Sequence, residues 1–504
     1  MDSWILFLSI LLALTLSILL LLTNNHKNQN QKQQQPQQQK QLQDQNQNQQ
    51  QQQQHAKQPP GPPSFLLLAD MIRHRRSVFD TEHLIRALHA RHGPVVALRL
   101  PFQRPSVFVA NRRLAHRALV EGGAAFAHRP PLVEPNVLFT CGQRDISSSS
   151  YGPYWRLVRR NLASEVLPPS RVELFAPTRS FKHAIFCLLV FMCFGVKLDD
   201  DTAIADIQAV QQFLLAAFTA FPVFAFFPMV TKLLFRKRWN ACVATKQKQQ
   251  EIFGALIRAR QEQKLKQESD RIAVAYVDSL LELRLPEEQG RSLTDGEVVS
   301  LCSEFLSGGT DTTATALQWI MANLTKLYEE IKTMVGTTER KEIDEKVLSS
   351  MPYLKAVILE GLRRHPPAHF VLPHTVTANM MLGEYCVPKG ADVNFMVAEI
   401  GWEGKVWEDP MEFRPERFLE GGEGEAVDIT GSREIKMMPF GAGRRMCPGY
   451  GLAMLHLEYF VSNLVWEFEW KAIEGEEIDM SEKLDFTVVM KTPLRARILS
   501  RGKN

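Results

Sequence analysis

The sequence is poor in cysteine: its 504 residues contain seven, spread from Cys141 to Cys447 without a CxxC pair. An odd number of widely separated cysteines in a long chain argues against a disulfide scaffold and against a zinc site built from cysteines. The sequence also lacks the GxxxxGK[ST] phosphate loop, the HExxH metal-binding pair and the GxSxG nucleophile motif. These absences leave P-loop nucleotide hydrolysis, zincin proteolysis and α/β-hydrolase chemistry without support.

Charge is nearly balanced along the chain, with 59 basic against 55 acidic residues and a formal net charge of +4. Residues 1–63 hold four Lys and two Asp and carry +2, so the remaining chain also carries only +2. No block of basic charge rises above this balance, and binding to nucleic acid is therefore not supported. Hydrophobic residues at 45% and charged residues at 23% are globular values, which exclude a wholly disordered or collagenous chain.

The chain begins with a long apolar run, Trp4–Leu22, interrupted only by hydroxyl side chains. Its 19 residues are enough to span the roughly 30 Å hydrocarbon core of a bilayer. Asp2 precedes the run and Lys27 and Lys32 follow it, so the positive-inside rule places the C-terminal side in the cytosol. A cleaved secretory signal is the alternative, but the run lacks a basic flank before it and an Ala-x-Ala site. We predict that residues 1–23 form an uncleaved signal-anchor transmembrane helix.

Residues 24–58 are dominated by Gln and Asn, a composition that cannot bury enough apolar surface to fold. We predict a disordered linker that tethers the following domain, with a polar interaction tract as the alternative. The linker ends in the proline hinge 59–63, a stiff element that redirects the chain. Residues 59–504 contain no internal repeat and are predicted to form one large α-rich domain.

Short-range patterns predict several elements of this domain. Two short β-like runs surround Pro101 and Pro105, and helical patterns dominate from about Trp155 onward. Proline positions set the bounds of one later helix, since a helix tolerates proline in its first turn but stops before it elsewhere. The predicted strands are Val95–Arg99 and Ser106–Ala110, and two predicted helices run from about Pro352 to before Pro366 and from Tyr450 to about Trp466.

Thr294 and Glu297 form a capping box, which predicts the start of a long helix. From Asp295 to Val335 the sequence contains no proline, so one uninterrupted helix of 41 residues would be about 60 Å long. That length is about the full diameter of a domain of this size. We therefore predict a break at Asn323–Thr325, where two poor helix formers flank one leucine.

The segment Phe213–Val230 is rich in phenylalanine and is followed by Lys232 and the cations at 236–238. An apolar patch beside cations is typical of a surface that enters a membrane interface. Ordinary burial in the core is an equally good interpretation of the same pattern.

The strongest motif is FGAGRRMCPG at residues 440–449. Gly441 and Gly443 allow the loop to bend tightly against a flat partner. Arg445 offers a forked cation for a carboxylate, and Cys447 precedes a predicted helix whose N–H groups would stabilise a thiolate. A buried free cysteine in a turn is the alternative for Cys447 alone. The complete FxxGxRxCxG spacing instead predicts that Cys447 binds the iron of a haem whose propionates meet the arginine.

Here the sequence resembles the cytochromes P450, specifically the plant microsomal A-type enzymes. The run DITGSREIKMMPFGAGRR at residues 428–445 looks most like the 89A subfamily. The resemblance covers the anchor, the hinge and nearly all of residues 59–500. It implies a mainly α fold, a helical prism with a smaller β-rich lobe, which follows an N-terminal transmembrane helix. It also implies haem b with an axial thiolate. In this chain Trp402-Glu403-Gly404 replaces a common Arg-Asp-Pro, and the segments at 177–182 and 323–327 look shorter than in relatives.

Glu360 and Arg363 lie three residues apart on one face of a predicted helix, which by itself is a common surface pair. In the family, the matching pair joins an arginine from a later loop and holds the segment beneath the haem. The sequence FRPERF at residues 413–418 matches that loop. The resemblance therefore implies a buried structural triad of Glu360, Arg363 and Arg417.

Gly308 and Gly309 lie inside the long predicted helix, where each glycine costs about 1 kcal/mol relative to alanine. Neighbouring threonines can hydrogen-bond back to carbonyls and loosen such a helix. A poorly formed surface turn or close helix packing would also explain the glycines. The resemblance implies that Asp311 and Thr312 are the acid–alcohol pair that delivers protons during oxygen activation.

Further cofactor and substrate contacts are implied by the resemblance alone. Trp155 and Arg159 match a WxxxR helix that meets a haem propionate, and Arg445 belongs to the same group. His374 occupies the position of another propionate donor, although a satisfied surface histidine is the alternative. Phe370 and Val371 are implied to line the substrate pocket together with the loop 132–145, and both could instead be ordinary core.

The resemblance implies a membrane-bound haem-thiolate monooxygenase on the cytosolic side of the endoplasmic reticulum. It would insert one oxygen atom of O₂ into an organic substrate, plant secondary or pigment-derived, with electrons from NADPH through a cytochrome P450 reductase. The two short segments leave a second interpretation, a catalytically impaired haem-binding membrane protein. A third is a haem-thiolate isomerase or dehydratase that needs no reductase. The intact pair of Asp311 and Thr312 favours the first over the third.

Overall fold

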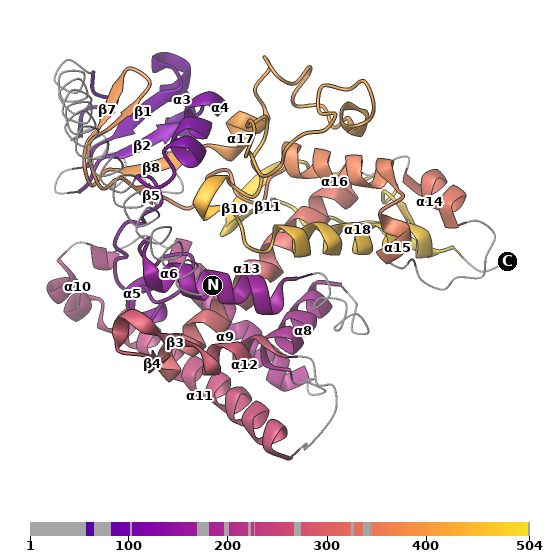
Figure 1. Cartoon of the computed structure of the whole chain (residues 1–504). Coiled ribbons are helices and arrows are strands. Elements are labelled where there is room, and N and C mark those ends of the chain that lie inside the picture. The colour runs from indigo at the N-terminus through magenta and orange to yellow at the C-terminus, as the bar shows by residue number, and fades with distance from the viewer. Residues whose placement is uncertain are drawn as a thin grey trace, which may run out of the picture. The chain divides into compact units, whose positions relative to one another are not determined.

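A computed structural model gives the fold of the chain (Figure 1). It describes residues 57–64, 82–100, 103–168, 181–195, 201–219, 223–225, 227–266, 274–323, 327–335, 343 and 345–501. The chain divides into two compact units. One comprises Met1–Gln58 with Gly383–Cys386, and the other comprises Pro59–Leu382 with Val387–Asn504. All the predicted site residues belong to the second unit.

Two predicted segments of the N-terminus, the anchor at 1–23 and nearly all of the linker at 24–58, lie outside the described residues. Among the residues that the structure does describe, no helix is both long and apolar enough to cross a bilayer. The proline hinge 59–63 is described. The carbonyl of Pro60 accepts a hydrogen bond from the Ala97 N–H at 2.7 Å, and Arg99 donates to the carbonyl of Pro59 at 2.7 Å. The hinge therefore runs against the first strand of the β-rich lobe.

The β-rich lobe is built on a four-stranded sheet in the order β1-β2-β8-β5. The antiparallel pair β1 (Val95–Leu98) and β2 (Ser106–Val109) confirms the two predicted strands. β2 pairs in parallel with β8 (Asp392–Phe395), which pairs antiparallel with β5 (His374–Thr375). Helix α3 (Glu82–His92) packs on β1 and buries its apolar side chains against this sheet.

The helical part surrounds the long helix α13, Asp295–Ala322. Its N-terminus has the predicted capping box: the Thr294 N–H donates to Glu297 Oε2 at 2.8 Å, and the Glu297 N–H donates to Thr294 Oγ1 at 3.3 Å. α13 packs against helices from both before and after it in the sequence. These neighbours are α8 (Phe181–Phe194), α9 (Asp201–Thr219), α11 (Arg236–Lys266), α12 (Tyr276–Glu282), α16 (Pro352–Arg364) and α18 (Tyr450–Glu467).

The remaining elements are short. Two of the predicted helices, α16 and α18, begin and end within a residue of their expected bounds. The other helices are α4 (Arg112–His116), η2 (Arg117–Glu121), α5 (Asn136–Phe139), α6 (Pro153–Asn161), η3 (Leu162–Val166), η5 (Val223–Ala225), α10 (Pro228–Leu234), η6 (Pro286–Glu288), α14 (Leu327–Val335), α15 (Glu345–Leu348), α17 (Val397–Gly401), η7 (Pro415–Phe418) and η8 (Gly443–Arg445). The other strands are β3 (Arg284–Leu285), β4 (Arg291–Ser292), β6 (Met380–Leu382), β7 (Tyr385–Val387), β9 (Phe468–Lys471), β10 (Glu482–Asp485), β11 (Thr487–Met490) and β12 (Arg497–Ser500).

The predicted break after α13 is confirmed. α13 ends at Ala322, and Asn323 caps it while its side-chain amide donates to the carbonyl of Trp319 at 2.8 Å. A separate helix, α14, then starts at Leu327, and residues 324–326 lie outside the described part. The change of direction brings Glu330 to the N-terminus of α16, where its carboxylate accepts the backbone N–H groups of Tyr353 and Leu354 at 2.7 and 2.8 Å.

The segment Phe213–Val230 is partly buried and partly exposed, so each of the two interpretations, core and membrane-interface surface, fits one part of it. Leu214 and Phe224 are buried, so its first part contributes to the core. From Phe227 onward the apolar side chains are exposed, with Met229 at 91% and Leu233 at 72%. α10 therefore presents an apolar face to its surroundings, next to the cations that open α11.

Candidate active site

Cys447 lies in a tight loop between η8 and α18. Its backbone N–H donates to the carbonyl of Phe440 at 2.9 Å, and this bond closes the loop. Gly443 has a φ of +69°, and a Cβ at this position would lie 1.9 Å from the carbonyl oxygen of Leu119. Only glycine fits so close to another backbone, so Gly443 seats the cysteine loop directly on η2.

The environment of the Cys447 thiol acts in two directions. Burial raises the pKa of the thiol, whereas a hydrogen bond from the Gly449 backbone and the charge of Arg159 lower it. The rise in the pKa of the thiol caused by burial applies to the protein without a bound metal. A bound cation would remove the proton outright, because a metal-coordinated thiol is deprotonated. The loop therefore offers one sulfur ligand that is supported from behind by a backbone N–H.

Three arginines gather beside this loop, and within the described part of the chain none of them has a carboxylate within ion-pair distance. Arg445 donates to the backbone carbonyls of Ala127, Ile146 and Ser149 at 2.7, 3.0 and 2.6 Å. Arg129 donates to the carbonyls of Ser147, Leu372 and Pro373, and Arg159 donates to the carbonyl of Met446. Burial lowers the pKa of Arg445 to about 10 and that of Arg129 to about 9. The sequence did not single out Arg129.

This set of donors fits haem. Guanidinium groups removed from water are stable only when an anion or several acceptors compensate their charge. Here backbone carbonyls are the hydrogen-bond acceptors in the described residues, while the nearby Asp145 and Glu304 offset only part of the cost of burial. A dicarboxylate such as the two propionates of haem would supply further negative charge and direct acceptors. The thiol of Cys447 and the guanidinium of Arg159 lie close enough for the arginine to lower the pKa of the thiol. A sulfur ligand and propionate donors are therefore present on one side of the same site.

Trp155 and Arg445 share one acceptor. The indole N–H of Trp155 donates to the carbonyl of Ile146 at 3.0 Å, and the Arg445 guanidinium lies over the indole ring at 4.4 Å from its centroid. On the other side of that residue, the Ile146 N–H donates to the carboxyl of Glu304 on α13 at 2.7 Å. Ile146 therefore connects α6, α13 and the cysteine loop through its backbone.

Glu304 was not identified from the sequence. It also accepts the Ser147 N–H at 2.5 Å, and burial together with the nearby charge of Asp145 raises its pKa to about 8. It lies seven residues before Asp311, which is two helical turns, so both side chains face the same side of α13. That spacing is the sequence signal that could have found it.

His374 is buried at 3% exposure, so the surface interpretation of this residue is wrong. Its Nδ1 lies 2.6 Å from the carbonyl of Phe126, which requires a proton on Nδ1. Burial and the charges of Arg129 and Arg445 lower the pKa of the ring well below 6.5. A neutral ring with this tautomer presents Nε2 as an acceptor, so a propionate contact at Nε2 would require a second proton.

The glycine pair lies within α13, which stays helical throughout, so a surface turn is wrong for these residues. A Cβ on Gly309 would lie 2.7 Å from Leu189 Cδ1 of α8, and close helix packing accounts for this glycine. A Cβ on Gly308 would meet nothing within 4 Å. The hydroxyl of Thr312 donates to the carbonyl of Gly308 at 2.7 Å, which is the backward bond that the sequence predicted. Asp311 and Thr312 are both partly exposed.

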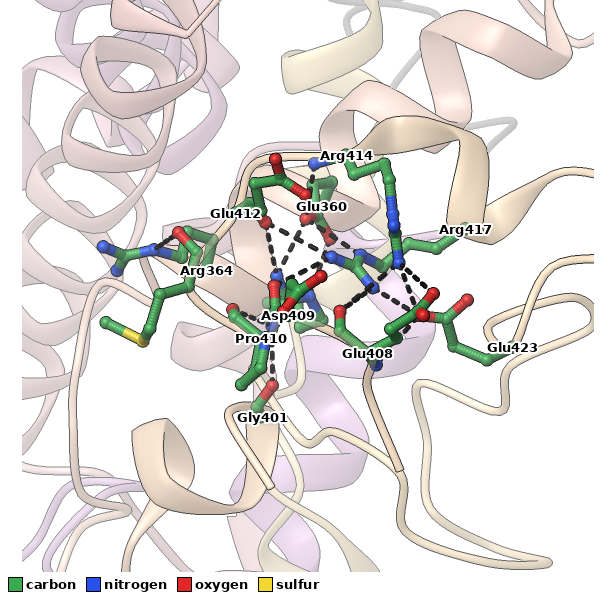
Figure 2. A network of polar contacts seen from close by, with 12 residues as sticks. Glu360, Arg364, Gly401, Glu408, Asp409, Pro410, Glu412, Arg414, Arg417 and Glu423 are labelled. Carbon is green, nitrogen blue, oxygen red and sulfur yellow. Dashed lines mark hydrogen bonds and ion pairs between the residues drawn. The ribbon is translucent and has the colours of Figure 1, made fainter. Parts of the chain in front are cut away.

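Glu360, Arg363 and Arg417 meet in a fully buried network (Figure 2). Arg363 donates twice to the Glu360 carboxylate, at 2.7 and 2.8 Å, and Arg417 donates to it at 3.2 Å. The remaining donors hold the loop that follows α17: Arg363 binds the carbonyls of Gly401 and Pro410, and Arg417 binds the carbonyl of Glu408. Glu423 is a second carboxylate on Arg417 that the sequence did not reveal.

The two predicted pocket residues lie in different surroundings. Val371 lies next to the cysteine loop, since a Cβ on Gly441 would be 3.7 Å from its Cγ1. Phe370 packs edge-on against Phe108 at 5.9 Å between ring centroids, among the apolar side chains of the β-rich lobe. Its contacts fit the core alternative. The loop 132–145 contains α5 and is held to itself by Gln143, whose side chain accepts the Leu132 N–H at 3.1 Å.

A glycine-rich loop with Cys447 before α18, a central helix with adjacent Asp311 and Thr312, and a buried Glu–Arg–Arg network are the features that the sequence predicted for a haem-thiolate oxygenase. The chain belongs to the cytochrome P450 family, whose profile matches residues 170–499. It is 45% identical over 489 residues to cytochrome P450 89A9 of Arabidopsis thaliana, which covers 89% of this chain and 94% of the relative. This identity places the chain in the plant 89A subfamily.

More distant relatives and solved structures agree. Isoflavone 2'-hydroxylase of Medicago truncatula is 29% identical over 88% of this chain and 92% of its own length. A zebrafish cytochrome P450 solved with abiraterone matches with a TM-score of 0.64 at 22% identity, over 83% of this chain and 99% of that one. A retinoic acid-bound cyanobacterial cytochrome P450, CYP120A1, gives 0.68 at 19% identity, over 88% of this chain and all of that one. The protein is thus a cytochrome P450 monooxygenase with haem b as its cofactor.

Proposed function

We propose that this protein is a membrane-bound monooxygenase that takes electrons from NADPH through a cytochrome P450 reductase. It inserts one oxygen atom of O₂ into a small organic substrate, plant secondary or pigment-derived. The observation that carries the proposal is the meeting of two sets of residues beside Ile146. Arg445 of the cysteine loop donates to the carbonyl of Ile146, and the Ile146 N–H donates to Glu304 of α13, the helix that carries Asp311 and Thr312.

Each residue has a distinct part in this proposal. Cys447 would hold the iron, and Arg129, Arg159 and Arg445 would bind the propionates. The bound haem supplies the redox chemistry of oxygen insertion. Thr312 controls a proton: its hydroxyl hydrogen is given to the carbonyl of Gly308, so it must rotate away before it can donate elsewhere. Asp311, at the next position in the helix, is the acid that resupplies that proton.

The carbon monoxide difference spectrum of the reduced enzyme tests the thiolate assignment. The wild type should give the red-shifted Soret band of a thiolate ligand, and Cys447→Ala should lose it while Cys302→Ala keeps it. Cys302 is the matched control because it is also free and is wholly buried in α13, away from any glycine loop. Persistence of the band in Cys447→Ala would contradict the assignment.

The two alternatives, an impaired haem-binding protein and an isomerase or dehydratase, predict different patterns of NADPH consumption and substrate conversion. An impaired haem-binding protein would show the thiolate band without NADPH consumption when mixed with a plant reductase. An isomerase or dehydratase would convert its substrate in the absence of NADPH. NADPH consumption that depends on both the reductase and the thiolate band supports the monooxygenase. Asp311 and Thr312 are both present on the partly exposed face of α13, which favours this outcome.

We further propose that the enzyme is a single-pass protein of the endoplasmic reticulum membrane, with its catalytic domain in the cytosol. The support is the apolar run Trp4–Leu22 with Lys27 and Lys32 after it, together with the exposed apolar face of α10. A chain that starts at Pro59 should keep its haem and become partly soluble. Adding Met229→Ser and Leu233→Ser should make it fully soluble. Full solubility without these substitutions would remove the role of α10, and loss of haem would contradict the tether.

A further inference from the structure

A buried polar network joins three helices, α9, α11 and α13. It contains Gln211 of α9, Lys246 and Gln249 of α11, and Ser303 and Ser307 of α13. The first four side chains are almost completely buried, at 6% exposure or less. Apolar residues adjoin it, including the cluster of Phe139, Val210, Leu214 and Cys242. Polar groups in such a place are costly unless they are satisfied or serve a ligand.

Four side-chain hydrogen bonds of this network point toward Gln211. The Lys246 ammonium donates to Gln249 Oε1 at 3.0 Å, and Gln249 Nε2 donates to the hydroxyl of Ser303 at 2.8 Å. Ser303 in turn donates to Gln211 Oε1 at 3.1 Å, and Ser307 donates to the same oxygen at 2.7 Å. Aligned donors polarise one another, so the amide N–H groups of Gln211 form the positive end of a chain that begins at an ammonium.

Lys246 has no carboxylate partner in the described part of the chain. Its two acceptors are neutral, the Gln249 amide and the carbonyl of Phe139 at 3.2 Å. Burial lowers the pKa of this amine, and the nearby thiol of Cys141 opposes the shift. An ammonium has three N–H donors, of which two are used here. The network therefore has both an uncompensated positive charge and an unused donor.

The other end of the network has spare donors too. Gln211 Nε2 carries two hydrogens, and its one contact is a long one, 3.4 Å to the carbonyl of Ser303. Ser307 is partly exposed and precedes Gly308, beside which a Cβ would meet nothing within 4 Å. Ser307 also lies four residues before Asp311, about 6 Å along the helix axis. The donor-rich end of the network thus opens toward the groups proposed to activate oxygen.

We propose that the Gln211–Ser307 end of this network binds a carboxylate of the substrate, with Lys246 as its distant counter-charge. The proposal rests on the monooxygenase function above and names the class of its substrate. A carboxylate supplies what the network lacks, because it accepts hydrogen bonds without donating any and carries the opposite charge. Held there, it would place the oxidised part of an organic acid beside Asp311 and Thr312. A neutral substrate of the same shape would leave the charge of Lys246 uncompensated.

The test compares one acid with its ester in the purified, haem-loaded, full-length enzyme. Dodecanoate and methyl dodecanoate are titrated separately, and the shift of the Soret band gives a Kd for each. The wild type should bind the acid more tightly than the ester. Lys246→Met should weaken binding of the acid about 10-fold and leave binding of the ester unchanged, since the counter-charge of the network is lost. Lys246→Arg keeps the charge and should keep the preference for the acid.

Two further variants separate binding from folding. Gln211→Glu puts a carboxylate at the donor end of the network, so it should abolish the preference for the acid. This second variant keeps the proposal testable if Lys246→Met does not take up haem. Lys248→Met is the matched control: it removes a charge two residues away, from a half-exposed lysine that pairs with Asp206 at 2.7 Å. It should change neither Kd.

Three outcomes would overturn the proposal. In the first, the wild type binds no dodecanoate or shows no preference for it. In the second, Lys246→Met weakens acid and ester equally, which would make the network structural. In the third, Gln211→Glu keeps the preference. A wild type with the thiolate band and no acid preference overturns this inference alone, whereas absence of the band overturns the proposed function as well.

Discussion

Replacing Glu360 by glutamine should lower the free energy of unfolding strongly, although the side chain hardly changes in shape. Its carboxylate accepts two hydrogen bonds from Arg363, one from Arg417 and one from the Arg414 N–H (Figure 2). Glu360→Gln keeps the size of the side chain but removes the charge and replaces one acceptor oxygen by a donor. Arg363 would then be a buried cation whose remaining acceptors are backbone carbonyls.

The expected magnitude follows from this geometry. Breaking a buried ion pair by removing one partner costs about 3–5 kcal/mol. A domain of about 440 residues unfolds with an entropy of about 0.9 kcal/mol/K, at about 2.1 cal/mol/K per residue. The midpoint of thermal unfolding should therefore fall by about 3–6 °C. Haem content should fall as well, because the same arginines hold the carbonyls of Gly401, Glu408 and Pro410 in place.

The assay compares Glu360→Gln with Asp485→Asn by calorimetry at neutral pH. Asp485 is an exposed carboxylate paired with Lys483 at 3.3 Å, so the same carboxylate-to-amide change should cost at most about 1 kcal/mol there. The two midpoints should differ by several degrees. Equal midpoints of thermal unfolding would refute the reasoning. They would mean that burial and the shared arginines do not increase the contribution of Glu360 to the free energy of unfolding.

Two other predictions concern α13. Thr312→Ala should keep the haem spectrum and NADPH consumption but lose about 10²–10⁴-fold in product while peroxide is released, because proton delivery fails; collapse of haem content would show a structural role instead. The pKa of Glu304 is raised from 4.5 to about 8, so the native state holds a proton that the unfolded chain has released. This contribution to stability is complete below about pH 4.5 and is lost as the pH rises through 8. Glu304→Gln should flatten the fall of the thermal midpoint between pH 5 and 8, and an unchanged slope would contradict this assignment.

Several elements could be predicted because their causes are local. The capping box of Thr294 and Glu297 requires only two residues three positions apart, and both bonds are present. The break at Asn323 followed from the length of an uninterrupted helix, which would equal about the full diameter of a domain of this size. The cysteine loop was recognisable because Gly443 must approach the Leu119 carbonyl, and this requirement leaves a fixed glycine in the sequence.

The charged parts of the site could not be predicted in the same way. Arg129, Glu304 and Lys246 look like ordinary polar residues in the sequence. Their character comes from burial among partners that mostly lie 18 to 244 residues away, such as the carbonyl of Pro373 for Arg129. Trp402 is similar. It stands where the sequence resemblance expects an arginine, and the guanidinium groups of Arg86 and Arg364 lie over its ring, at 5.2 and 5.5 Å from the centroid.

The backbone of Ile146 explains why these parts act as one site. Its N–H is held by Glu304 on α13, and its carbonyl accepts hydrogen bonds from both Trp155 on α6 and Arg445 of the cysteine loop. A shift of α13 at Glu304 must therefore move the acceptor of Arg445 or break one of these bonds.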